Sequence, residues 1–197
     1  MDQTNFFSLF FLTFITMAFV LAPVSSTTTS TTKKNTNFVK TSCNVTTYPS
    51  VCLTSLLPYA SAVKSNPIRL VKQALSVTLK ASSTTRSMIS TLAKAKNITK
   101  GDAAVLKDCI VDIQDSISEI KDSLKAISSL KSSADKKFVL SNAETWTSAA
   151  LSDEYSCTDG MEDEEVSPAV KKKIKTSVFS IARLSSNALY LINHLNI

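Results

Sequence analysis

The chain has 197 residues, of which 44% are hydrophobic and 19% are charged, and its 22 Lys and Arg outnumber its 16 Asp and Glu. It contains two glycines, Gly101 and Gly160, which argues against most β architectures, because hairpin turns and bulges depend on glycine. So few glycines also exclude a glycine-rich phosphate loop. The length of the chain fits one domain with a sizeable core.

The N-terminal residues 1–26 predict a cleaved secretory signal peptide. Phe6 to Leu21 is uncharged and rich in Phe, Leu and Ile, and the small residues of Ala22 to Ser26 follow it. No Lys or Arg precedes this run, which departs from the usual pattern. Since about 16 apolar residues are fewer than the roughly 20 of a membrane-spanning helix, we expect a secreted, extracellular protein without membrane attachment after cleavage.

Four cysteines form an even set, which in an oxidising compartment predicts two disulfides, with three pairings open: Cys43, Cys52, Cys109 and Cys157. Two N-glycosylation sequons begin at Asn44 and Asn97, and glycans at both would fit the surface of a secreted protein. An unmodified asparagine is the alternative at each position.

Residues 27–37 are rich in Ser and Thr and lack apolar side chains, so they predict a disordered leader, with an O-glycosylated stalk as the alternative.

Residues 38–66 predict a helical hairpin. Its two short helices separate at Tyr48-Pro49, because proline disfavours helix at the preceding residue but suits the first turn of the next helix.

Residues 67–197 predict four long helices, because apolar residues recur in each at three- and four-residue steps. The first runs from Pro67 to about Lys96, and the second follows Asp102, which we expect as its N-cap. The third spans Ala134 to Tyr155 and the fourth starts at Pro168. Long amphipathic helices with short loops predict an all-α protein whose core is an antiparallel, up-down-up-down four-helix bundle.

The second of these helices carries the clearest pattern. Seven apolar residues follow steps of four and three without interruption, which indicates packing at a shallow angle: Leu106, Ile110, Ile113, Ile117, Ile120, Leu124 and Ile127. Five acidic residues are expected to project away from this row: Asp108, Asp112, Asp115, Glu119 and Asp122. In the third helix the expected inward positions are Phe138, Val139, Ala143, Trp146, Ala149 and Ala150.

Residues for catalysis are scarce. His194 is the only histidine, and a Ser–His triad needs a histidine held by a carboxylate in a packed site. No Cys-x-x-Cys or Glu-x-x-His motif is present, so we expect no metal, no cofactor and no enzyme activity. Secretion disfavours nucleic acid as a partner, and the function is expected to be binding.

The densest basic cluster comprises Lys171, Lys172, Lys173 and Lys175. It is either a solvated helix face or a contact for an acidic polysaccharide or partner.

Four stretches resemble the plant invertase and pectin methylesterase inhibitor family. They are Cys43-x-x-Thr46-x-Tyr48-Pro49-x-x-Cys52-x-x-x-Leu56, Leu106-x-Asp108-Cys109, the stretch Trp146 to Leu151 with Cys157-Thr158-Asp159-Gly160, and Ser186-Asn187-Ala188-Leu189. Together they span Phe38 to Ile197. The resemblance implies a four-helix bundle preceded by a helical hairpin, and the disulfide pairings Cys43–Cys52 and Cys109–Cys157.

The resemblance further implies a one-to-one complex that covers the substrate cleft of a target enzyme. The stretches Thr145–Leu151 and Pro67–Leu79 are more similar to the pectin methylesterase inhibitors, and the Pro-Lys-Phe tripeptide associated with invertase inhibitors is absent. We therefore expect an inhibitor of pectin methylesterase in the plant cell wall (apoplast). The alternatives are an inhibitor of cell-wall or vacuolar acid invertase and a non-inhibitory pectin-binding wall protein.

Family contact positions fall on five residues, by alignment on Cys109 and Cys157: Asp115, Ser118, Ser148, Ser156 and Asp159. A solvated surface charge is the alternative for both aspartates. Val111 and Ser118 stand where some inhibitors carry acidic residues, and Met161 replaces a frequent Phe. These departures bear on affinity and pH dependence rather than on the fold.

Overall fold

The computed structural model describes residues 26–161 and 166–196, and every regular element in these ranges is helical. The predicted signal peptide, residues 1–26, lies outside the described residues apart from Ser26. None of the helices within the described part of the chain is long and apolar enough to cross a membrane.

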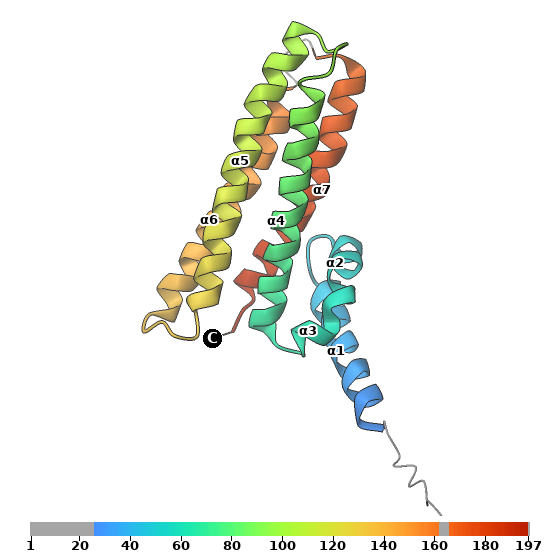
Figure 1. Ribbon diagram of the computed structural model, residues 1–197. Helices are drawn as coiled ribbons and strands as arrows, with labels where there is room; N and C mark the ends of the chain where they lie inside the picture. Colours follow the sequence, from blue (N-terminus) through green and yellow to red (C-terminus); the bar gives the residue numbers. More distant parts are fainter. Residues whose placement is uncertain (1–25, 162–165, 197) are drawn as a thin grey trace, which may run out of the picture.

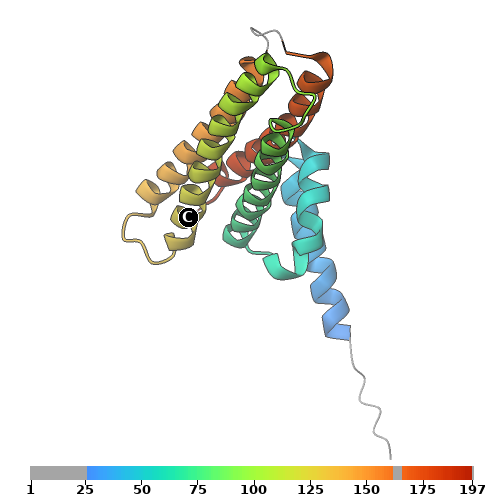
Figure 2. The same ribbon diagram turned by 45° about the horizontal axis from the view of Figure 1, so that its top comes forward.

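The four long helices are α4 (Pro67–Leu92), α5 (Lys100–Ser129), α6 (Lys136–Asp159) and α7 (Pro168–Asn193). They run alternately up and down (Figure 1), which confirms the predicted antiparallel bundle. Helix α4 packs against α5 and α7, and α6 packs against the same two helices. The pair α4 and α7 therefore forms one side of the bundle, and the pair α5 and α6 forms the opposite side (Figure 2).

Local sequence explains where these helices begin. Asn66 precedes Pro67 and its side chain accepts the Arg69 backbone N–H at 3.0 Å, so α4 starts with an N-cap and a proline that needs no hydrogen bond. Helix α5 differs from the expectation, because Thr99 is its N-cap and accepts the Asp102 backbone N–H at 3.0 Å.

Asp102 has another role, since it lies in the first turn of α5 and is only 1% exposed. Its carboxylate accepts the backbone N–H of Ser167 at 2.7 Å and the Ser167 hydroxyl at 3.0 Å. The hydrogen bond from the Ser167 backbone is the main cause that lowers the pKa of Asp102 below its ordinary value. Asp102 therefore joins the start of α5 to the start of α7.

Burial in the core confirms the apolar row predicted on α5. Five of its seven members are buried, and Ile110 and Leu124 are half-buried at its margins. In contrast, Phe138 was expected to point inward but is 63% exposed. Helix α6 begins at Lys136, so Phe138 lies in its first turn, at the end of the bundle.

The predicted disordered leader, 27–37, differs from the structure, in which α1 (Ser26–Asn44) is helical throughout. Asn35 is buried and its side-chain oxygen accepts the Ser65 hydroxyl at 2.9 Å, and Val39 is fully buried one turn further on. The segment contains no apolar residue, so its composition predicts disorder. It is helical because α1 continues from it to the buried Val39, and because Asn35 makes a buried polar contact.

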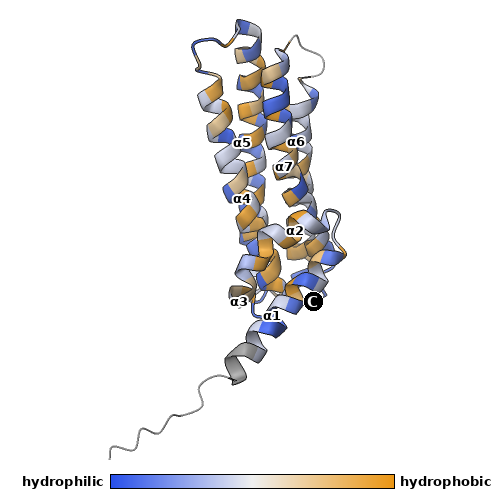
Figure 3. Cartoon of the chain, turned by 90° about the vertical axis from the view of Figure 1, so that its right-hand side faces the viewer, coloured by the Kyte–Doolittle hydropathy of each residue, from blue (hydrophilic) through white to orange (hydrophobic). Residues whose placement is uncertain are grey.

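The N-terminal hairpin consists of α1, α2 (Pro49–Leu56), the 3-10 helix η1 (Leu57–Tyr59) and α3 (Ala60–Val63). A disulfide between Cys43 and Cys52 joins α1 to α2, and one between Cys109 and Cys157 joins α5 to α6. These are the two pairings that the family resemblance implies. Figure 3 shows hydrophobic residues gathered where α2 and α3 meet the bundle.

Asn187 of α7 attaches the hairpin to the bundle. Its side-chain oxygen accepts the Tyr48 backbone N–H at 2.8 Å, and its side-chain N–H donates to the Tyr48 carbonyl oxygen at 3.0 Å. The Arg183 guanidinium lies 5.8 Å from the centre of the Tyr48 ring. Asn187 is 3% exposed, so its side chain makes both hydrogen bonds from a buried position.

Candidate functional site

The side of the bundle formed by α5 and α6 carries a row of carboxylates. Five lie on α5 at steps of four and three residues: Asp108, Asp112, Asp115, Glu119 and Asp122. Three of them are exposed, as expected, whereas Asp112 and Glu119 are half-buried beside α6. Asp153 of α6 adds a sixth carboxylate. We call these six residues the acidic face.

The carboxyl groups of Glu119 on α5 and Asp153 on α6 lie near each other across the two helices, and each affects the pKa of the other. Burial is the main cause that raises the pKa of Glu119 to about 7, and the Asp153 hydrogen bond and the charges of Asp153, Asp115 and Asp122 add to it. Burial also raises the pKa of Asp153. Glu119 therefore retains its proton in mildly acidic solution.

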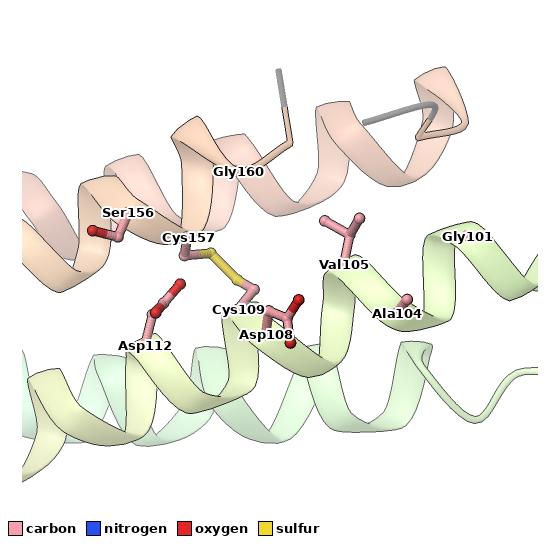
Figure 4. Close-up of a pocket in the computed structure, with 9 residues that line it drawn as sticks. All are labelled: Gly101, Ala104, Val105, Asp108, Cys109, Asp112, Ser156, Cys157 and Gly160. Atoms are coloured by element: carbon pink, nitrogen blue, oxygen red, sulfur yellow. A yellow bond between two sulfur atoms is a disulfide. The ribbon is translucent and has the colours of Figure 1, made fainter. Parts of the chain in front are cut away.

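A pocket of about 320 Å³ lies between α5 and α6, beside the Cys109–Cys157 disulfide. Figure 4 shows Asp108 and Asp112 on either side of this bond, with Ser156 above them on α6. Burial raises the pKa of Asp112, and the neighbouring charges of Asp153, Asp108 and Asp115 raise it further. The disulfide joins α5 to α6 at this point, so it helps to fix the register that places Asp153 of α6 near the carboxylates of α5.

The structure brings only some of the predicted contact residues together. Asp115 belongs to the acidic face, and Ser156 lines the pocket with Asp108 and Asp112. Ser148 lies instead in a groove of about 570 Å³ between α6 and α7. The Ser118 hydroxyl donates to the Gln114 carbonyl oxygen of its own helix at 3.1 Å.

All five predicted contact residues are exposed, and Asp159 is the last residue of α6. The other five members of the acidic face were not predicted as site residues: Asp108, Asp112, Glu119, Asp122 and Asp153. The regular spacing of the acidic residues on α5 was the available signal, but Asp153 joins them only through the register of α5 against α6.

Sequence reasoning also missed Glu154, which is 0% exposed inside the bundle. One of its carboxyl oxygens accepts the hydroxyls of Ser116 on α5, at 2.9 Å, and of Ser185 on α7, at 2.8 Å. Burial raises the pKa of Glu154 to about 7, and the two serine hydrogen bonds only partly oppose this effect. Three of the four helices therefore meet at a buried, titratable group.

The remaining candidates lie apart from the acidic face. His194 is exposed at the C-terminal end of α7, where its ring stacks on Tyr190 at 4.0 Å. No group of His, Cys, Asp and Glu among the residues that the structure describes has the arrangement of a metal site. Trp146 is half-buried and packs against the core.

The two asparagines of the sequons are exposed. Asn97 lies in the loop between α4 and α5, and Asn44 ends α1. Thr46, in the first sequon, is buried and its hydroxyl donates to the Cys43 carbonyl oxygen at 2.8 Å. Glycosylation at either asparagine stays a prediction.

The family model described as "Plant invertase/pectin methylesterase inhibitor" matches residues 37–191. The chain belongs to this family. The match covers the helical hairpin from Asn37 onward and nearly all of the bundle, including both disulfides and the acidic face.

Two relatives from Arabidopsis thaliana support the same assignment. Pectinesterase inhibitor 10 is 38% identical over 167 residues, which are 84% of this chain and 53% of that protein, so the chain spans about half the length of this relative. Pectinesterase inhibitor 11 is 34% identical over 196 residues, which are 98% of this chain and 97% of that protein.

A solved structure supports the fold. The crystal structure of a mutant form of a pectin methylesterase inhibitor from Arabidopsis matches with a TM-score of 0.64 and 18% identity, over 80% of this chain and 97% of that one. The family and these relatives are named as inhibitors rather than enzymes, which confirms the expectation that the chain is not an enzyme.

Proposed function

We propose that this protein is a secreted inhibitor of pectin methylesterase in the plant cell wall, and that it binds one enzyme molecule across its pectin-binding cleft. Membership of the inhibitor family supports the class of target, since the two Arabidopsis relatives are named pectinesterase inhibitors. The observation that carries the binding mode is the acidic face.

The acidic face has the charge and shape to compete with pectin, which is itself an anionic chain. From Asp108 to Asp122 the carboxylates extend over fourteen residues of helix, a length of about 21 Å at 1.5 Å per residue. A cleft that holds an anionic polysaccharide presents polar and basic groups, and these would bind such a row of carboxylates.

The same side of the bundle is rigid before binding. The Cys109–Cys157 disulfide joins α5 to α6 next to the pocket, and the apolar row of α5 is buried below the carboxylates. A preorganised surface loses little conformational entropy on association, so more of its contact energy appears as affinity. Asp115 and Asp159 are the proposed charged contacts. Ser118, Ser148 and Ser156 are the proposed polar contacts, of which Ser148 lies apart, in the groove between α6 and α7.

A titration tests this proposal. The purified, oxidised protein is added in steps to a plant pectin methylesterase at mildly acidic pH, and the residual activity is measured. We expect a linear fall to an endpoint at one equivalent. Asp115→Ala and Asp159→Ala should each raise the inhibition constant by about tenfold, as for the loss of a charged interface contact.

The matched control is Asp135→Asn. Asp135 caps α6 by accepting the Phe138 backbone N–H at 2.9 Å, and asparagine caps a helix equally well, so this variant removes a carboxylate without loss of the cap. Inhibition should be unchanged in the control. If the protein inhibits none of several esterases but inhibits an acid invertase, the proposed target is wrong and the protein is an invertase inhibitor.

A further inference from the structure

Acidic and basic residues are sharply segregated along the chain. Apart from Asp2, every Asp and Glu lies between Asp102 and Glu165, a segment that includes all of α6 and α5 from its third residue onward. This segment contains 15 Asp and Glu but only six Lys and Arg. Residues 26–101 and 168–197 together contain 16 Lys and Arg and no Asp or Glu.

The fold converts this segregation into two opposite surfaces. Helices α4 and α7 lie side by side on the side of the bundle away from α5 and α6, and the hairpin packs on them (Figures 1 and 2). The hairpin, α4 and α7 contribute no carboxylate side chain at all. Their exposed cations include Lys80 on α4 and Lys172, Lys173 and Arg183 on α7. We call these four residues the basic face.

We propose that the basic face binds a carboxylate-bearing polysaccharide, namely de-esterified pectin, while the acidic face binds the enzyme. Lysine supplies compact charges that attract carboxylates without demanding one fixed geometry, which suits a flexible polymer of repeated charges. The four cations are distributed along two neighbouring helices of 26 residues each, so they favour an extended polyanion over a small anion.

The surface between these cations is mainly polar, with the exposed aromatic side chain of Phe179 on α7 beside Arg183 in the helical repeat. Exposed serine and threonine residues occupy α4 and α7, namely Ser83, Thr84, Ser87, Thr91, Thr176 and Ser180. Five of these hydroxyls donate to backbone carbonyl oxygens of their own helix, which leaves their oxygens as acceptors toward a ligand. A polysaccharide, which carries many hydroxyl donors, is therefore a better match to this surface than an apolar partner.

The identity of the polymer rests on the proposed function, because pectin is the substrate of the proposed target; the charge segregation does not depend on it. Since the two faces are on opposite sides, enzyme and polymer can be bound together. Binding to the product of the esterase would retain the inhibitor where the enzyme has acted and raise its local concentration there.

The test is affinity electrophoresis of the oxidised protein through gels that contain polygalacturonate or highly methyl-esterified pectin. The basic-face variant is Lys80→Gln, Lys172→Gln and Lys173→Gln combined. The control, Lys131→Gln, Lys136→Gln and Lys137→Gln combined, removes the same charge from exposed residues near the loop between α5 and α6. Glutamine retains helix propensity in both variants, and Lys171 and Lys175 stay unchanged.

We expect polygalacturonate to retard the wild type and the control, and the basic-face variant to bind about tenfold more weakly. Binding should also fall about tenfold between about 50 and about 200 mM NaCl, because salt screens the attraction. Equal weakening in both variants, equal retardation by esterified pectin, or no retardation at low salt would overturn the proposal. Binding to phosphatidylserine vesicles but not to polygalacturonate would overturn it in favour of a lipid surface.

Inhibition of the esterase is measured on the same proteins by the titration described above. The basic-face variant and the control should both reach the endpoint at one equivalent, because neither changes the acidic face. Retardation by polygalacturonate without any inhibition would contradict the proposed function and leave the basic face established. Inhibition without retardation by polygalacturonate would support the proposed function and overturn the proposal for the basic face.

Discussion

Glu154 makes the stability of the bundle depend on pH in a direction that the structure specifies. The side chain is 0% exposed, and no lysine or arginine is among the groups that shift its pKa. Its pKa rises from 4.5 in the unfolded chain to about 7 in the fold, which corresponds to about 3 kcal/mol at 1.36 kcal/mol per unit. The contribution of protonated Glu154 is fully present below pH 4.5 and is lost as the pH rises to about 7.

Glu154→Gln isolates this contribution. The glutamine side chain of this variant retains an oxygen that can accept the Ser116 and Ser185 hydroxyls, but it has no proton to lose. The free energy of unfolding is measured by urea titration of both proteins between about pH 4 and about pH 8. Relative to the variant, the wild type should lose about 3 kcal/mol across this range.

The difference between the two proteins is the informative quantity. Glu119, Asp153 and Asp112 also have raised pKa values, so they lower the stability of both proteins in the same direction as the pH rises. Glu144→Gln makes the same chemical change nearer the other end of α6 and is the matched control. Parallel curves for the wild type and Glu154→Gln would refute the assignment of a buried, protonated Glu154.

Three further predictions concern contacts between elements. Asp102→Ala should lower the free energy of unfolding at neutral pH by about 2 kcal/mol or more, because Ser167 loses its buried partner, and urea unfolding measures this. Asn187→Ala leaves the Tyr48 backbone groups unpaired and should increase amide exchange in the hairpin, measured by mass spectrometry, while exchange in α5 stays unchanged. Replacing Cys109 and Cys157 by serine opens a loop of 48 residues and should cost about 4 kcal/mol, measured by denaturant unfolding.

Much of the fold follows from local sequence. The steps of three and four between apolar residues predict each long helix, and prolines at the first helical position place the starts of α4 and α7 within a residue. Local patterns are less informative about burial, because burial depends on which other helices cover a side chain. Phe138 fits the apolar periodicity of α6 but lies at the end of the bundle, where no second helix covers it.

At residues 27–37 the structure is more ordered than the sequence predicts. Residues 27–37 lack apolar side chains, so composition alone predicts disorder. The structure orders them because α1 extends back from buried Val39, and because Asn35 meets Ser65 from the turn before α4. A contact between residues thirty positions apart leaves no periodic signal in the sequence.

By itself the sequence determines the helical class, the number of disulfides and the row of carboxylates on α5, because these depend on residue type and spacing along one helix. Only the tertiary structure decides which carboxylates meet across helices, since that depends on the register of α5 against α6. It places Asp153 beside Glu119 and buries the adjacent Glu154, although both are acidic residues on the same turn of α6. One residue along a helix turns a side chain by about 100°, which here separates a surface carboxylate from a core one.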